Sequence, residues 1–336
     1  MELNEWIQAA NQTFIAMKDP YESVEKVYPR ALEKYSVGSR YMGVKNKSHI
    51  PRHLIEQLET FRYILHTLDK ASMGGRAIDV SLINPISGRP MTGSSSGTAI
   101  NVLLGINDLG IGTDGGGSVL APAMAVQLFG FISPIIEQEH LEKFSSTSTD
   151  GIGFHASIGF MSREFEVILH AIQCVLPLED TKTIASPRIF ATGPLDDLDV
   201  AKNVKIVQTP NLFGERELLI EFLKENLSEC DFLISKEGPV DFLGFGDTVL
   251  GHLGYEANRS QQSSGKGLIR VANMVDATAL VVPTKDFACG YVLLCESTLP
   301  KVKAMLEFAK TIALSQDPLL KKYFQNIENY FPDEFV

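Results

Sequence analysis

Two clusters of small residues flank an apolar run in the first third of the chain. Residues 92–98 read Thr-Gly-Ser-Ser-Ser-Gly-Thr, and residues 112–118 read Gly-Thr-Asp-Gly-Gly-Gly-Ser. Consecutive glycines let backbone N–H groups converge on an anion, and the hydroxyl of Ser118 follows them directly. A serine beside such N–H donors could act as a nucleophile with an oxyanion hole next to it.

Two other interpretations of this stretch are less consistent with the sequence. A flexible linker is disfavoured because residues 99–104, between the clusters, are apolar enough to be buried. A phosphate-binding loop is disfavoured because the Gly-x-x-x-x-Gly-Lys-Ser/Thr motif is missing. The segment most similar to this motif, residues 265–267 (Gly-Lys-Gly), lacks the Ser/Thr and the upstream glycine.

The two clusters resemble the signature blocks of the amidase signature family, serine hydrolases with a Ser–Ser–Lys triad. Residues 92–98 correspond to the family's GGSSGGS block, and residues 112–118 match every fixed position of its GTDxGGS block. Ser94 and Ser118 are 24 positions apart (118 − 94), the separation expected in the family. The resemblance implies an α/β fold with a mixed β-sheet core covered on both faces by helices.

The resemblance also implies roles for the residues of the two blocks. Ser118 is the expected nucleophile, and Ser94, held on a cis peptide in the family, is expected to pass its proton to a lysine. That lysine must be neutral, which requires burial to lower its pKa from about 10.4. The remaining expected site residues are Gly115, Gly116 and Gly117 as the oxyanion hole, Ser95 beside the lysine, and Thr113 and Asp114 as supports of the loop.

The catalytic lysine is predicted to be Lys18. Family members carry this lysine at the end of an apolar strand upstream of the first serine block. Residues 13–17 read as such a strand, and Lys18 follows them. Lys45 and Lys47 are the second choice, because no apolar strand is evident before them. With Lys18 near the start, the chain looks like a short member without the usual N-terminal helical extension.

A third block and two departures complete the comparison. Residues 148–150 and 159–163 resemble the family's Ser-x-Asp and Gly-Pro-x-x-Arg elements, with Arg163 expected to be structural. Leu120 replaces a family arginine, and residues 132–134 (Ile-Ser-Pro) stand where the family has Lys-Pro-Thr. These departures keep a second hypothesis open, a catalytically lapsed amidase fold that serves as a binding or scaffold protein. An amidotransferase subunit is a third.

The elements that must position these residues alternate along the chain. Helices are predicted at residues 2–10, 52–71, 164–176, 215–226 and 301–314. Strands are predicted at 13–17, 77–80, 204–208, 232–235, 278–283 and 291–294, and residues 239–267 are predicted to be a long loop with turns. This alternation favours an α/β protein. We expect one domain over residues 1–336, with 12–175 carrying the triad core and 180–270 a reduced variable region near the pocket.

Composition narrows the function classes. A chain of 336 residues with 44% hydrophobic and 21% charged residues is typical of a globular protein. Its net charge of −11 disfavours nucleic acids and anionic membranes as partners, and it has no apolar run of about 20 residues and no signal-like N-terminus. Its four cysteines form no metal-ligand pattern, as expected for a reduced, cytoplasmic protein. The prediction is an amidohydrolase for a small-molecule amide, without cofactor or metal, with a homo-oligomer left open.

Overall fold

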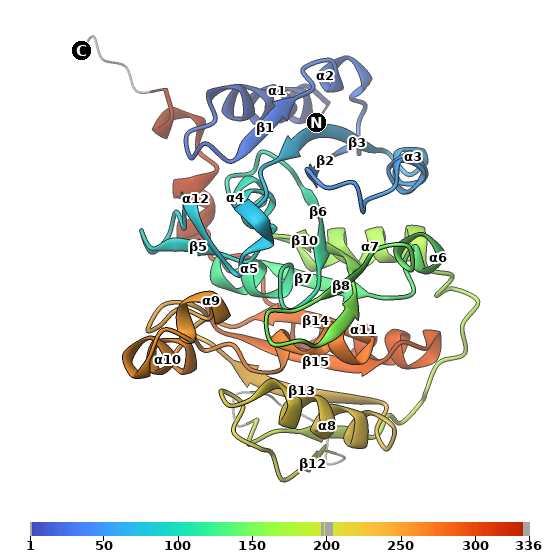
Figure 1. The fold of residues 1–336 in the computed structure, drawn as a ribbon. Coiled ribbons are helices and arrows are strands. Elements are labelled where there is room, and N and C mark those ends of the chain that lie inside the picture. The colour runs from blue at the N-terminus through green and yellow to red at the C-terminus, as the bar shows by residue number, and fades with distance from the viewer. Residues whose placement is uncertain (1, 196–197, 199–203, 332–336) are drawn as a thin grey trace.

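Eleven strands of the described residues form one sheet that runs through the molecule (Figure 1). The structure is a computed structural model that describes the chain except residues 1, 196–197, 199–203 and 332–336. In spatial order the strands are β1 (Val24–Val27), β3 (Tyr63–Asp69), β2 (Arg40–Lys45), β6 (Leu109–Asp114), β10 (Ser157–Ser162), β7 (Phe129–Ser133), β14 (Ala277–Pro283), β15 (Gly290–Glu296), β13 (Phe232–Glu237), β11 (Ile189–Ala191) and β12 (Val204–Ile206).

The sheet is mixed. Strand β2 is parallel to both β3 and β6, and β11 is parallel to both β12 and β13. The pairings between these two parallel groups, from β6 through β10, β7, β14 and β15 to β13, are all antiparallel. Two small antiparallel sheets lie apart from it, formed by β4 (Ile78–Ile83) with β5 (Pro90–Thr92) and by β8 (Ser145–Thr147) with β9 (Gly153–His155).

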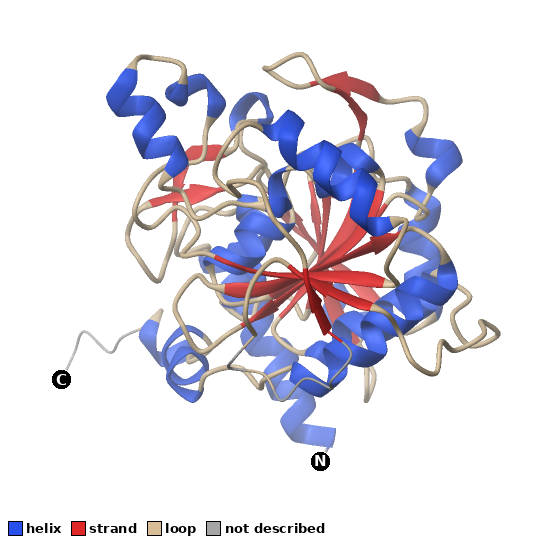
Figure 2. Ribbon diagram, turned by 90° about the horizontal axis from the view of Figure 1, so that it is seen from below, coloured by secondary structure: helices blue, strands red, loops and turns tan. Residues whose placement is uncertain are grey.

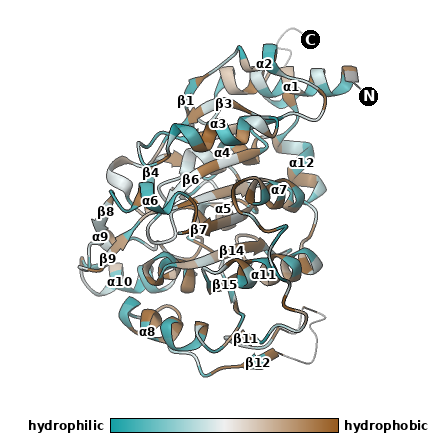
Figure 3. Ribbon diagram, turned by 90° about the vertical axis from the view of Figure 1, so that its right-hand side faces the viewer, coloured by the Kyte–Doolittle hydropathy of each residue, from teal (hydrophilic) through white to brown (hydrophobic). Residues whose placement is uncertain are grey.

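Helices cover both faces of the sheet, and a separate apolar core fills each side. One core contains side chains of α4 (Ser96–Leu103), α5 (Leu120–Ala125) and α8 (Arg216–Leu227). The other contains side chains of α3 (Arg52–Thr60), α7 (Phe165–Val175) and α11 (Leu299–Ile312). Figure 2 shows the twisted strands enclosed by helices, and in Figure 3 the middle strands are mostly hydrophobic. The predicted fold class is therefore confirmed.

The remaining helices are shorter or more peripheral. They are α1 (Glu2–Lys18), α2 (Ala31–Lys34), α6 (Gln138–Leu141), α9 (Thr248–Gly251), α10 (Tyr255–Gln262) and α12 (Pro318–Phe324), with 3₁₀ turns η1 (Met73–Gly75), η2 (Leu268–Arg270), η3 (Ala272–Val275) and η4 (Ile327–Asn329). In the part of the chain that the structure describes, no helix combines the length and hydropathy needed to cross a membrane.

The strand predicted at residues 13–17 is wrong, because residues 2–18 form the single helix α1. Positions 9, 12, 13 and 16 are buried, while Phe14, Met17 and Lys18 are exposed. Burial at spacings of three and four is the pattern of a helix face, whereas a strand would alternate. A run of five apolar residues is too short to distinguish the two periods by sequence.

The helix predicted over residues 52–71 is only half right. Helix α3 ends at Thr60, and residues 63–69 form strand β3 between β1 and β2. Arg62, with φ +68°, makes the turn between the two elements. The other predicted strands, at 77–80, 204–208, 232–235, 278–283 and 291–294, are found as β4, β12, β13, β14 and β15, and the helices at 164–176, 215–226 and 301–314 are α7, α8 and α11.

Candidate active site

Both serine blocks lie where a strand turns into a helix, and they line one cavity. Residues 93–95 connect β5 to α4, and residues 115–119 connect β6 to α5. The cavity has a volume of about 400 Å³, and its lining includes Ser94 and Ser118 together with Lys45. The fold therefore brings two hydroxyls, from two connections, and one amine, from the end of strand β2, to a common space.

Lys45 is the lysine at this site. It ends strand β2, and only 2% of its surface is exposed. Its Nζ donates hydrogen bonds to Ser94 Oγ at 2.7 Å, to Thr113 Oγ1 at 3.0 Å and to the Thr113 carbonyl oxygen at 3.2 Å. Burial lowers the pKa of Lys45 to about 7, although the negative charge of Asp114 opposes this shift. An amine with this pKa is partly neutral at physiological pH.

Lys18, the residue chosen from the sequence, lies elsewhere. It is exposed at the end of α1, with its Nζ 5.8 Å from the centre of the Phe331 ring, and it does not line the cavity. The structure therefore contradicts the predicted position of Lys18 at the site, and Lys45 is the lysine that lies with the two serines. Helix α1 precedes Lys45 in the chain, and it contains the helix predicted at residues 2–10.

A signal for Lys45 was present but weak. The segment before it, residues 40–45 (Arg-Tyr-Met-Gly-Val-Lys), does form a buried strand, contrary to the prediction. Gly43 interrupts its apolar pattern, and the structure gives the reason. A Cβ at Gly43 would collide with the side chains of Asn107 and Asp69. Close packing therefore requires glycine at position 43. The same glycine breaks the apolar pattern, so hydrophobic periodicity did not predict the strand.

Ser95 joins the two serine blocks instead of contacting the lysine. Its N–H donates to the Ser118 carbonyl oxygen at 3.2 Å, and its buried hydroxyl donates to the Thr113 carbonyl oxygen at 3.4 Å. Ser94 is itself 5% exposed. The cis peptide expected at Ser94 is not found, since within the described residues the only cis bond is Gly238–Pro239.

Asp114 shapes the loop that carries Ser118. Its carboxylate accepts the N–H groups of Gly116 at 3.0 Å, Gly117 at 2.7 Å and Val119 at 2.6 Å. Burial raises the pKa of Asp114, and these hydrogen bonds oppose the shift. Three glycine N–H groups were expected to form the oxyanion hole. Those of Gly116 and Gly117 already donate to Asp114, which leaves the N–H of Gly115. Ser118 is half-buried and reachable from the cavity.

Gly115 and Gly117 are required for different reasons. A Cβ at Gly115 would collide with the Phe154 ring, which comes from β9 and lines the same cavity. Gly117 has φ +95°, in the left-handed region that other residues rarely adopt. The loop in front of Ser118 therefore needs glycine both for close contact with a neighbouring ring and for backbone conformation.

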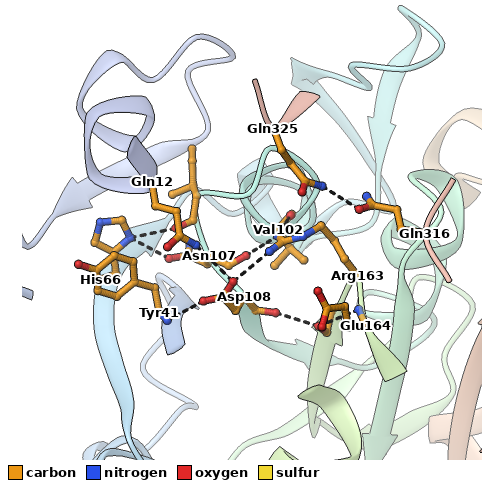
Figure 4. Close-up of polar contacts among 12 residues, drawn as sticks. Gln12, Tyr41, His66, Val102, Asn107, Asp108, Arg163, Glu164, Gln316 and Gln325 are labelled. Carbon is orange, nitrogen blue, oxygen red and sulfur yellow. Dashed lines mark hydrogen bonds and ion pairs between the residues drawn. The ribbon is translucent and has the colours of Figure 1, made fainter. Parts of the chain in front are cut away.

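The third block contributes a buried cation away from the cavity. Arg163 follows β10, is 8% exposed, and donates to the carbonyl oxygens of Val102 and, at 2.6 Å, Asn107. It also pairs with Asp108 at 3.0 Å (Figure 4). These contacts join the end of β10 to the connection between α4 and β6.

Removal of this arginine should therefore reduce stability. We expect Arg163→Met to lower the free energy of unfolding by about 3 kcal/mol, because buried carbonyls and Asp108 lose their donor. Arg188→Met is the control, since Arg188 has 65% of its side chain exposed and lies 3.8 Å from Asp231. It should cost less than about 0.5 kcal/mol. Equal losses in urea denaturation would contradict the structural role of Arg163.

The two departures from the family pattern lie in the core. Leu120 is fully buried in α5, and Ile132 and Ser133 are fully buried in β7, where Ser133 Oγ lies 2.7 Å from Thr278 Oγ1. None of them lines the cavity around Ser118. These positions therefore contribute to the packed interior and not to the cavity lining.

Comparisons with known proteins agree with this arrangement. The Amidase family profile matches residues 83–189, which contain both serine blocks. A comparison with curated proteins gave no match. Among solved structures, a bacterial aryl acylamidase of the amidase signature enzymes superimposes with a TM-score of 0.62 at 14% identity, over 93% of this chain and 94% of that chain.

Two further solved structures share the fold. A 6-aminohexanoate cyclic dimer hydrolase, solved with its substrate, has a TM-score of 0.59 at 14% identity, covering 93% of this chain and 95% of that one. An amidase family protein from Bacillus anthracis str. Ames has a TM-score of 0.54 at 11% identity, covering 89% and 84%. The chain thus has the fold of these hydrolases, and the segment that carries both serine blocks is similar to the Amidase family.

Proposed function

We propose that this protein hydrolyses a small carboxamide or amide-linked metabolite through an acyl-enzyme on Ser118, with Ser94 and Lys45 as its proton relay. One observation carries the proposal: the buried amine of Lys45 donates to Ser94 Oγ inside the cavity that Ser118 also lines. A lysine with a pKa of about 7 has the protonation behaviour that a general base needs near neutral pH. Amide hydrolysis also agrees with the family match.

The proposed reaction has two halves. Neutral Lys45 takes the proton of Ser118 through the hydroxyl of Ser94, and Ser118 Oγ forms a bond to the amide carbon. The tetrahedral oxyanion is held by N–H groups of the loop, chiefly those of Gly115 and Ser118, which do not donate to Asp114. The C–N bond breaks as the relay returns the proton to the leaving nitrogen. Water then cleaves the ester by the same relay, which releases the acid and restores Ser118.

One link of this relay has to form when substrate binds. Among the described residues, no hydrogen bond joins the hydroxyls of Ser94 and Ser118, although both line the cavity. Catalytic hydrogen bonds in enzymes without substrate are often long and shorten in the complex. The Lys45–Ser94 contact is already at 2.7 Å, so only the outer step requires adjustment.

Labelling of the wild-type protein with a fluorophosphonate probe, followed by peptide mapping, tests the proposal. Modification should occur at Ser118 and be lost or strongly slowed in Lys45→Ala, because the probe reports an activated serine. A folded wild-type protein that does not label would contradict the proposal and favour a lapsed amidase fold that only binds. Ligand screening would then replace the search for amide substrates.

The pH dependence follows from the direction of the lysine shift. Because burial lowers the pKa of Lys45 to about 7, the amine is protonated below that pH and neutral above it. We expect kcat/KM for an uncharged amide to rise as pH increases through about 7 and to level off above it, since this parameter reports ionisations of the free enzyme. Activity that stays constant from about pH 5 to about pH 9 would be inconsistent with Lys45 as the base.

A further inference from the structure

Arg216 lies beside the proposed nucleophile. It begins α8, lines the cavity that contains Ser118, and has 13% of its side chain exposed. Its Nε and Nη2 bind Asp150 at 2.6 and 2.7 Å, on the connection between β8 and β9. Its Nη1 takes no part in that pair and lies 3.7 Å from the position a Cβ would occupy at Gly116. One edge of the guanidinium is thus fixed by Asp150, and the other faces the Ser118 loop.

A second arginine stands next to it. Arg270 and Arg216 both line a smaller cavity of about 50 Å³, which Ser118 also lines. Arg270 donates to the carbonyl oxygens of Leu212 and Gly214 at 2.9 and 3.0 Å. Within the described residues no carboxylate pairs with it. Burial lowers the pKa of Arg270, and the negative charges of Glu237, Glu215 and Asp150 oppose this shift.

The lining of the small cavity is cationic, although the chain has a net charge of −11. It contains Arg216, Lys266 and Arg270, and none of its lining residues is Asp or Glu. Lys266 is already neutralised, because its Nζ lies 2.5 Å from Asp241 Oδ2. Arg216 is likewise paired, with Asp150, so within the described residues Arg270 is the cation of this lining that has no carboxylate partner. An anion in the recess would balance its charge.

We propose that Arg216 and Arg270 form a carboxylate-binding subsite, and that the substrate carries a carboxylate close to its scissile amide. The inference rests on the proposed amidase function and names its substrate class. A guanidinium matches the planar geometry of a carboxylate, and a recess of about 50 Å³ suits a small group. Because Ser118 lines the same recess, the carboxylate and the reacting carbonyl belong to one short molecule.

A binding experiment tests the subsite without turnover. Succinate and succinamide have nearly the same shape and differ in charge, so calorimetry should show succinate binding the wild-type protein at least about tenfold more tightly. Arg216→Gln and Arg270→Gln should each remove most of that preference, and Arg216→Lys should restore part of it. Arg259→Gln is the matched control, since Arg259 lies on α10 with 65% of its side chain exposed and should not alter it. Equal binding of the two ligands would overturn the subsite.

Kinetic measurements distinguish carboxylate binding by Arg216 from a purely structural ion pair between Arg216 and Asp150, in the hairpin of β8 and β9. The ratio of kcat/KM for succinamic acid over succinamide should exceed about ten in the wild type and fall about tenfold or more in Arg216→Gln. Asp150→Asn removes the ion pair with Arg216 but keeps the guanidinium, so the ratio should persist. A ratio lost equally in Asp150→Asn would contradict direct carboxylate binding.

The two proposals can fail separately. If Ser118 is labelled and both amides are hydrolysed at equal rates, the carboxylate subsite is wrong and the amidase function stands. If Ser118 is not labelled but succinate binding still requires Arg216, the subsite stands and the hydrolytic function fails.

Discussion

Lys45→Ala is expected to lower kcat/KM for an amide by about 10²–10⁴-fold near pH 8, the contribution typical of a positioned general base. The physical reason is that Lys45 is the buried amine in contact with Ser94, and burial lowers its pKa to about 7. Lys45→Met, which fills the buried space with an apolar chain of similar length, should be equally inactive. Steady-state kinetics on both variants would measure the loss.

Lys18→Ala is the matched control for this prediction. Lys18 is exposed at the end of α1, so its replacement should leave kcat/KM within about twofold of the wild type. Circular dichroism and urea denaturation would establish that Lys45→Met is folded. This control is needed because the variant removes the hydrogen bonds from Lys45 to the buried hydroxyls of Ser94 and Thr113, which also affects stability. Full activity in a folded Lys45→Met would rule out this residue as the base, and loss of activity in Lys18→Ala would revive the original assignment.

Ser118→Ala should have the larger effect and reduce turnover by at least about 10⁴-fold, close to the background rate. Without its hydroxyl no acyl-enzyme can form, whereas the cavity and the loop held by Asp114 remain. Ser94→Ala should also be severely impaired, because it removes the hydroxyl through which Lys45 is proposed to take the proton of Ser118. Ser228→Ala, at the exposed end of α8, should behave as the wild type.

Mass spectrometry of the protein mixed with substrate gives an independent check on Ser118. A transient increase in mass on a peptide that contains Ser118, absent in Ser118→Ala, is the expected sign of the acyl-enzyme. Turnover by Ser118→Ala at a rate near that of the wild type would mean that water attacks the amide directly. The serine would then have a binding role only.

Much of the candidate site was accessible from local sequence. Residues 112–118 place three glycines and a serine directly after a buried strand, and the structure shows why that order matters locally. Asp114 accepts N–H groups two, three, five and six positions ahead, and Gly117 has a conformation open to few other residues. Contacts of this range depend on neighbouring residues in the chain, so a motif can represent them.

The lysine could not be chosen in the same way. Residues 13–17 and residues 40–45 are both short and partly apolar, and each could form a helix or a strand. Strand β2 forms because β3 and β6 hydrogen-bond to its two edges, and it requires Gly43 where Asn107 and Asp69 pack against it. Helix α1 instead buries one face against the rest of the fold.

The sequence by itself therefore determined the loop that carries Ser118, the serine pair and the α/β class, since these depend on local backbone preferences and on hydrophobic periodicity. Only the tertiary structure decided which lysine contacts Ser94. It also decided that Arg216 and Arg270 line a cavity together with Ser118. Those residues are distant from the serines along the chain, and they meet at the site because the sheet and its helices bring separate connections to one cavity. Their chemical roles depend on burial and on neighbouring charges, which exist only after the chain has folded.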